Sequence, residues 1–166
     1  MAQTDEAAVW YSKAIKFGKQ GLFEEALRAY DEALRLTPGY LDAWYKKGVI
    51  LGKLGRHEAA IKAYEEVIRL QPDLAEAWCN KGNRLVHLNR KIEALEFFEQ
   101  AARIKPDYAH AWYNAACIYA LKKEKEKALD ALHKVARLSR KYMEEAKTDK
   151  YFENLRDDES FKKLIK

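Results

Sequence analysis

Glycine, proline and cysteine are all scarce in this sequence. The 166 residues include 7 glycines, 3 prolines and 2 cysteines. With so few residues that interrupt helices, and with abundant alanine, leucine, lysine and glutamate, the composition favours helix from end to end. The two cysteines, Cys79 and Cys117, provide no disulfide framework and lack the spacing of a metal site. We therefore expect an all-α protein from a reducing compartment.

Long apolar runs are also absent. No stretch approaches the roughly eighteen apolar residues that cross a bilayer, and the N-terminal stretch MAQTDEAAVWYSK lacks the basic and then apolar segments of a signal sequence. We expect a cytoplasmic protein that does not enter a membrane. The net charge is +5, from 31 lysines and arginines against 26 acidic residues, and this mild excess permits acidic partners without requiring them.

Tryptophan is rare but regularly placed. The chain has four tryptophans, each 34 residues from the next: Trp10, Trp44, Trp78 and Trp112. Counting tryptophan as position 4 defines four repeats at about 7–40, 41–74, 75–108 and 109–142. Position 8 is then always glycine or alanine, position 20 is always alanine, and position 32 is proline in the first three repeats. A constant period of this length indicates a repeat architecture.

Each repeat is predicted to be a pair of helices. Positions 4, 8 and 11 lie on one helical face, and positions 20, 24 and 27 lie on one face of a second helix. The small residues at positions 8 and 20 let the two helices approach closely. Gly21, Gly55 and Asn89 at position 15 tolerate the left-handed backbone that ends the first helix, whereas Lys123 departs from this rule. Proline at position 32 ends the second helix, and the fourth repeat has Arg140 there.

The pattern W-x3-[GA]-x2-[FLY]-x8-A-x3-[YFL]-x7-P resembles the tetratricopeptide repeat family over about residues 7–142. The resemblance implies a right-handed superhelical solenoid of antiparallel helix pairs. It also implies a non-enzymatic scaffold or adaptor that binds a peptide or a partner-protein segment in its concave groove. Lys13, Lys47 and Lys81 depart from the family at position 7, where leucine is usual. We expect each lysine to pack its stem while its charge stays in water.

The tail, residues 143–166, has a different pattern and is predicted to form C-terminal capping helices. Asp149, Asp157 and Asp158 are each suited to cap a short helix. The last repeat of a solenoid has an apolar face without a neighbour, which an amphipathic tail can cover. The apolar residues of the tail are Phe152, Leu155, Phe161 and Leu164.

Catalytic, metal and cofactor motifs fail on inspection. HEAAI, at residues 57–61, lacks the second histidine of a zinc-protease helix. GVILGKLG, at residues 48–55, has Leu54 where a phosphate-binding loop needs serine or threonine. No two of the histidines share a helix face as an adjacent pair. We therefore predict no enzyme activity, no metal and no cofactor. The four histidines are His57, His87, His110 and His133.

A stripe at positions 2, 5, 6, 9 and 13 of each first helix lies opposite the tryptophans. In the tetratricopeptide repeat family, this stripe lines the concave groove in which partners bind. The predicted groove residues are Tyr11, Lys19, Tyr45, Lys46, Val49, Lys53, Asn80, Asn83, His87, His110, Tyr113 and Asn114.

Two binding modes of the family were compared with this stripe. The carboxylate clamp matches at one of five positions, so the sequence does not predict a clamp. The second mode is an asparagine ladder at position 6, which Asn80 and Asn114 match and Ser12 and Lys46 do not. A carboxamide presents a donor and an acceptor, as a peptide unit does, and can pair with the backbone of an extended segment.

The basic residues at positions 6 and 13 predict that the N-terminal part of the groove prefers acidic segments. These basic residues are Lys19, Lys46, Lys53 and His87, and the acidic residues on the same stripe are Asp42 and Glu76, at position 2 of the second and third repeats. The expected partner is thus a protein or peptide segment, extended and partly acidic.

Two alternative functions remain open. A pI of about 9.0 and tyrosines beside lysines are compatible with weak nucleic-acid binding. The second alternative is self-association. We expect Thr4 to cap the first helix, and because no repeat precedes the first one, its N-terminal face is available to bind another copy of the chain.

Overall fold

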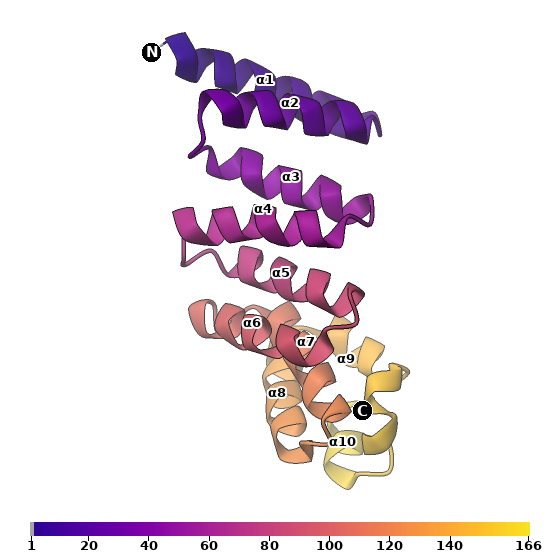
Figure 1. Cartoon of the computed structure of the whole chain (residues 1–166). Helices are drawn as coiled ribbons and strands as arrows, with labels where there is room; N and C mark the ends of the chain where they lie inside the picture. The colour runs from indigo at the N-terminus through magenta and orange to yellow at the C-terminus, as the bar shows by residue number, and fades with distance from the viewer. Residues whose placement is uncertain (1) are drawn as a thin grey trace.

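The computed structural model describes the backbone of residues 2–166 and the side chains of residues 5–166. Between residues 2 and 166 there is no strand, and the helices follow one another in pairs (Figure 1). The first helices of the pairs are α1 (Ala2–Lys19), α3 (Leu41–Lys53), α5 (Ala75–His87) and α7 (Ala109–Leu121). The second helices are α2 (Phe23–Leu36), α4 (His57–Leu70), α6 (Lys91–Ile104) and α8 (Lys125–Leu138). The expected all-α, right-handed solenoid of antiparallel helix pairs is confirmed.

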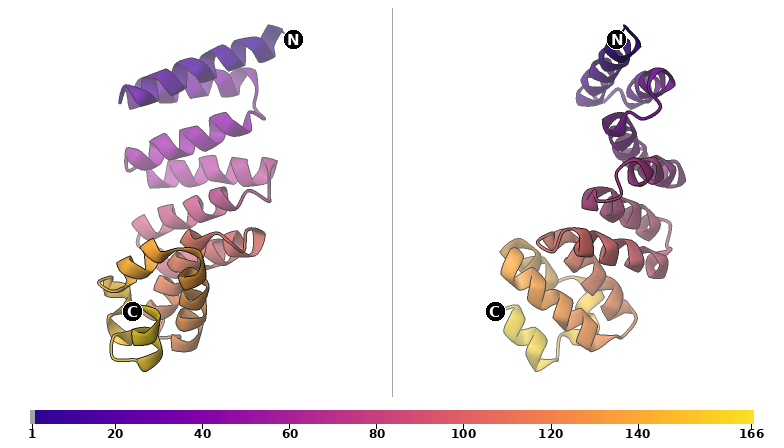
Figure 2. Two further views of the ribbon diagram at one scale, coloured as in Figure 1. Left: turned by 180° about the vertical axis from the view of Figure 1, so that it is seen from behind. Right: turned by 90° about the vertical axis from the view of Figure 1, so that its left-hand side faces the viewer.

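The helix pairs stack into a curved array. Figure 2 shows α1, α3 and α5 in one row and α2, α4 and α6 in another, with the row of first helices on the inner side of the curve. Figure 1 shows α7 and α8 turned steeply away from the direction of α1 to α4, as the superhelical twist accumulates. None of the helices in residues 2–166 is both long and apolar enough to span a membrane.

Small residues allow the two helices of a pair to touch. A Cβ atom added to Gly48 would lie 2.9 Å from the ring of Tyr64, and one added to Gly82 would lie 2.7 Å from the ring of Phe98. The ring at position 24 therefore fills the space that glycine leaves at position 8. The predicted close approach is confirmed. The alanines at position 20 are all fully buried: Ala26, Ala60, Ala94 and Ala128.

The turn inside each pair uses a left-handed residue at position 15. Gly21 and Gly55 have φ values of 76° and 72°, and Asn89 has 61°. Lys123 has a φ of 60°, so it adopts the same conformation although it has a Cβ atom. The departure expected at Lys123 is thus one of residue type and not of backbone shape.

Each tryptophan after the first ties its helix to the preceding loop. The indole N–H donates a hydrogen bond to the proline carbonyl six residues earlier, and the ring packs on the hydrophobic core. Tryptophan and proline at this spacing therefore fix the junction between repeats. The donor–acceptor pairs are Trp44 and Pro38 at 2.8 Å, Trp78 and Pro72 at 2.8 Å, and Trp112 and Pro106 at 2.9 Å.

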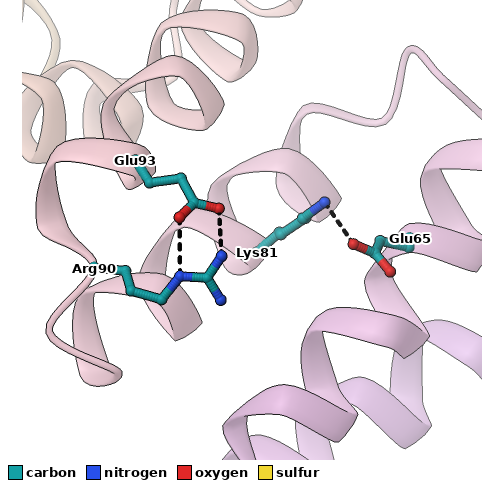
Figure 3. Close-up of polar contacts among 4 residues, drawn as sticks. All are labelled: Glu65, Lys81, Arg90 and Glu93. Atoms are coloured by element: carbon teal, nitrogen blue, oxygen red, sulfur yellow. Dashed lines mark hydrogen bonds and ion pairs between the residues drawn. The ribbon is translucent and has the colours of Figure 1, made fainter.

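Two of the three lysines at position 7, Lys47 and Lys81, form ion pairs across repeats, which corrects the expectation that water holds their charge. Lys13 is exposed and forms no ion pair within residues 5–166. Nζ of Lys81 lies 2.8 Å from Glu65 on α4, and the Lys81 side chain is 15% exposed (Figure 3). Nζ of Lys47 lies 2.6 Å from Asp31 on α2 in the same way. Figure 3 also shows the pair of Arg90 with Glu93, which stays inside the third repeat. Lys47 and Lys81 therefore each link their helix to the second helix of the preceding repeat.

The tail covers the last repeat as predicted. It forms α9 (Arg140–Ala146), the 3-10 helix η1 (Lys150–Leu155) and α10 (Glu159–Leu164), which pack on α7 and α8. Phe152 and Phe161 are fully buried in this contact.

Two of the three candidate aspartates cap helices of the tail. Asp149 accepts a hydrogen bond from the backbone N–H of Tyr151 and caps η1, and Asp158 caps α10. Asp157 is exposed and precedes the capping residue. At the other end of the chain, α1 begins at Ala2, before Thr4, so the prediction that Thr4 precedes and caps this helix is wrong. The side chain of Thr4 lies outside the described residues.

Candidate functional site

All of the predicted groove residues lie on α1, α3, α5 and α7, the row of helices on the inner side of the curve (Figure 2). The 34-residue period brings equivalent positions onto the same face of successive helices. The structure therefore places them along one continuous surface. They differ, however, in how much of each side chain remains accessible.

Unpaired lysines characterise the N-terminal part of this surface. Lys19, Lys46 and Lys53 are exposed, and none of them is in an ion pair within residues 5–166. Beside them, the ring of Tyr11 packs 4.9 Å from the ring of Tyr40. This part of the groove is therefore positively charged and lined by tyrosine.

Two asparagines of the predicted ladder bind neighbouring repeats. Nδ2 of Asn80 donates to Oη of Tyr45 at 3.0 Å. Nδ2 of Asn114 donates to Oδ1 of Asn83 at 3.0 Å. A carboxamide has two donor hydrogens and one oxygen, so Asn80 keeps one N–H and its oxygen for a ligand. Nδ2 of Asn114 also donates to Sγ of Cys79 at 3.8 Å, so Asn114 keeps only its oxygen. The asparagines thus have a structural role in addition to any role in binding.

The capping helices cover the α7 part of the surface. Tyr113 is 6% exposed, and its Oη donates to Oδ2 of Asp149 at 2.8 Å. The ring of Tyr142 on α9 stacks on Tyr113 with ring centroids 5.0 Å apart, and on His110 at 5.7 Å with an interplanar angle of 4°. The cap therefore covers the C-terminal end of this inner surface, and we call the part over α1, α3 and α5 the open groove.

Burial keeps the polar groups near α7 uncharged. It raises the pKa of the Cys79 thiol to about 12, so this cysteine is not a thiolate nucleophile at neutral pH. Burial, assisted by Cys117 and by the bond to Asp149, raises the pKa of Tyr113 well above its usual range, which keeps its hydroxyl a donor. Burial also lowers the pKa of His110. Together, these groups are packed and hydrogen-bonded and lack the features of a catalytic centre.

Tyrosines at position 34 are groove-lining residues that the sequence reading missed. Tyr40 packs on Tyr11, Tyr108 contacts His110 edge to face at 6.0 Å, and Tyr142 stacks on Tyr113. The signal was available, since the three are separated by multiples of 34 residues and only Leu74 breaks the series.

Other surfaces offer less for recognition of a partner chain. Residues 2–166 contain no group of three or more histidine, cysteine, aspartate or glutamate side chains placed to hold a metal. A pocket of about 780 Å³ lies on the outer side between α2, α3 and α4, where Trp44, Lys47 and Arg56 line it. Lys47 and Arg56 are already paired with Asp31 and Glu24, so this pocket belongs to the junction between repeats.

Comparison with known proteins gives a family match and a likeness of fold. The tetratricopeptide repeat (TPR) profile matches residues 11–75 and 51–109, and a second profile of the same description matches residues 109–142. No curated protein sequence matches the chain.

The similar solved structures include MamA, YrrB and a TPR of Spaghetti (RPAP3). MamA from Desulfovibrio magneticus RS-1 is 26% identical with a TM-score of 0.80, and the match covers 97% of this chain and 94% of that chain. YrrB, described as a TPR protein with an unusual peptide-binding site, is 18% identical with a TM-score of 0.74 over 93% of this chain and 80% of that chain. The first TPR of Spaghetti (RPAP3), bound to the HSP90 peptide SRMEEVD, is 19% identical with a TM-score of 0.68, and the match covers 72% of this chain and 95% of that chain.

Proposed function

Because the chain belongs to the tetratricopeptide repeat family, we propose that it is a non-enzymatic protein-interaction scaffold that binds an extended segment of a partner protein in the open groove over α1, α3 and α5. The observation that carries this proposal is the unpaired and accessible set of polar groups there, above all Lys46, Lys53 and the free amide oxygen of Asn80. YrrB and the Spaghetti TPR, which share the fold, are described with a peptide-binding site or a bound peptide.

The chemistry of the open groove suits an extended and partly acidic ligand. Carboxamides can pair with the backbone of the ligand, and tyrosines provide large contact areas with little side-chain entropy to lose. Glu76 is paired with Lys105 at 3.0 Å, so its charge is already balanced. The unpaired lysines therefore attract acidic side chains.

Self-association through the first repeat is less favoured by the side chains on α1. Val9 at position 3 is 53% exposed. Lys16 at position 10 is also exposed, whereas the equivalent residue of the second repeat, Ile50 on α3, is buried. A second copy stacked on α1 would meet greater bulk at position 3 than the interior repeats present there. The residues equivalent to Val9 are all fully buried alanines: Ala43, Ala77 and Ala111.

The proposal is tested by selecting binders from a displayed library of protein fragments. The affinity of the selected peptides is then measured for Lys46→Glu and for Lys62→Glu, which makes the same charge change on the outer helix α4. We expect enriched acidic peptides that lose about tenfold in affinity with Lys46→Glu and are unaffected by Lys62→Glu.

An empty selection, or equal affinities for the two variants, would contradict groove binding. Oligonucleotide binding that collapses steeply with salt would instead support the nucleic-acid alternative.

A further inference from the structure

A second pocket lies outside the groove, where the third repeat, the fourth repeat and the cap meet. It has a volume of about 480 Å³. Three lysines from three separate elements line it: Lys91 from the start of α6, Lys123 from the turn between α7 and α8, and Lys150 from the start of η1. Leu121 and Tyr151 provide its apolar wall.

The positive charge of this pocket is not balanced inside the chain. Within residues 5–166, Lys91, Lys123 and Lys150 form no ion pair, and Glu153 is the acidic residue among the lining side chains. Other basic residues nearby are paired, as Lys122 is with Glu124 at 2.5 Å. Three ammonium groups against one carboxylate leave an excess that attracts an anion.

The residue type at position 123 is consistent with a role for its side chain. The φ of 60° at Lys123 is one that residues with a Cβ atom adopt at a cost, and the equivalent positions hold Gly21, Gly55 and Asn89. Side chains kept in such conformations are concentrated at functional sites. A lysine at this position is explained if its side chain is needed in the pocket that it lines.

The shape and chemistry of the pocket indicate the kind of ligand. A phosphate group concentrates about two negative charges and three acceptor oxygens on one atom, so each oxygen can accept from one lysine. Leu121 is 45% exposed, and the Tyr151 ring lies 5.3 Å from Nζ of Lys91, so an organic part of the ligand has an apolar surface to contact.

We propose that this pocket binds a small organic phosphate, with Lys91, Lys123 and Lys150 holding the phosphate group and Leu121 and Tyr151 contacting its carbon part. The volume falls within the range usual for small-molecule sites. The site is separate from the open groove and does not depend on peptide binding there.

The test is to titrate the protein with phenyl phosphate and, separately, with inorganic phosphate. Calorimetry measures the affinity, and the chemical shifts of the backbone amides show where each compound binds. We expect shifts at residues 91, 123 and 150–154 and binding of phenyl phosphate several-fold tighter than that of inorganic phosphate. Lys123→Asn should weaken both by about tenfold, because one charge-assisted contact is lost.

Lys123→Asn is a sharp variant because Asn89 already has the same conformation in the third repeat, so the substitution leaves the turn intact. Lys62→Asn, which removes the same charge on α4, should leave binding unchanged. Equal affinities of the two variants, shifts spread over the whole surface, or equally tight binding of citrate would overturn the proposal.

Discussion

At the scale of single residues, the repeat tolerates substitutions when they preserve backbone shape. Position 15 is glycine, glycine, asparagine and lysine in the four repeats, yet all four have a φ between 60° and 76°. The same backbone hydrogen bond closes the turn in all four repeats, in the fourth from the N–H of Glu124 to the carbonyl of Tyr119, and Lys123 adopts the left-handed conformation that this turn requires. The left-handed backbone therefore carries a cost at Lys123 that is absent at Gly21 and Gly55.

Replacing Lys123 with glycine is expected to raise the free energy of unfolding by about 1 kcal/mol, because the left-handed conformation no longer strains a Cβ atom. Urea denaturation measures the change. Gly55→Ala is the matched control. A Cβ atom there would meet nothing within 4 Å, so its expected loss of about 1 kcal/mol is purely conformational. A less stable Lys123→Gly variant would show that the lysine side chain contributes more than its backbone costs.

At the scale of elements, contacts between helices of different repeats decide which surface is free. Position 5 of one repeat contacts position 6 of the next, as in the bond between Tyr45 and Asn80. The cap continues this series, because Tyr113 donates to Asp149, which lies 36 residues further along the chain. The cap therefore takes the place of a fifth repeat over α7.

Asp149→Ala should destabilise the cap by about 2 kcal/mol, because it removes a helix-capping bond to the backbone of Tyr151 and the bond from Tyr113. Hydrogen exchange of α9, η1 and α10 measures the effect locally. The neighbouring Asp157→Ala removes an exposed carboxylate that caps no helix, so its exchange should match the wild type. Similar protection in both variants would mean that apolar contacts alone hold the cap in place.

At the scale of the whole molecule, two histidines couple stability to pH. The rings of His87 and His57 stack across the second and third repeats at 4.8 Å with an interplanar angle of 12°. Burial, together with the charges of Arg84 and His57, lowers the pKa of His87, and burial beneath the cap lowers the pKa of His110. Both histidines are therefore uncharged over more of the neutral range in the folded chain than in the unfolded chain.

Stability should fall as the pH drops below about 6.5, the usual pKa of histidine. There the unfolded chain binds protons that the folded chain does not, so protonation favours unfolding, and the full stability is present above this pH. Urea denaturation from pH 7 to pH 5 measures the slope. His87→Gln should flatten it, whereas His133→Gln, at an exposed position on α8, should leave it unchanged. An identical slope in both variants would rule out His87 as a source of the pH dependence.

The 34-residue spacing of tryptophan by itself determined the helix pairs, their close contacts and the inner row of first helices. These features are set by residues within one repeat, where 3.6 residues per turn fixes which side chains share a face. The helical spacing of the apolar residues in the tail likewise predicted that it covers the last repeat. The position-34 tyrosines follow from the same period.

Only the tertiary structure showed which groove residues are accessible. It placed Asp149 and Tyr142 over Tyr113, engaged one N–H of Asn80 with Tyr45, and brought Lys91, Lys123 and Lys150 to one pocket. The contacts of Asp149 and of the three lysines join elements that differ in sequence and do not repeat with the period of the array. Their geometry depends on how the twist accumulates over successive repeats and on where the cap docks, and no spacing within a single helix encodes either.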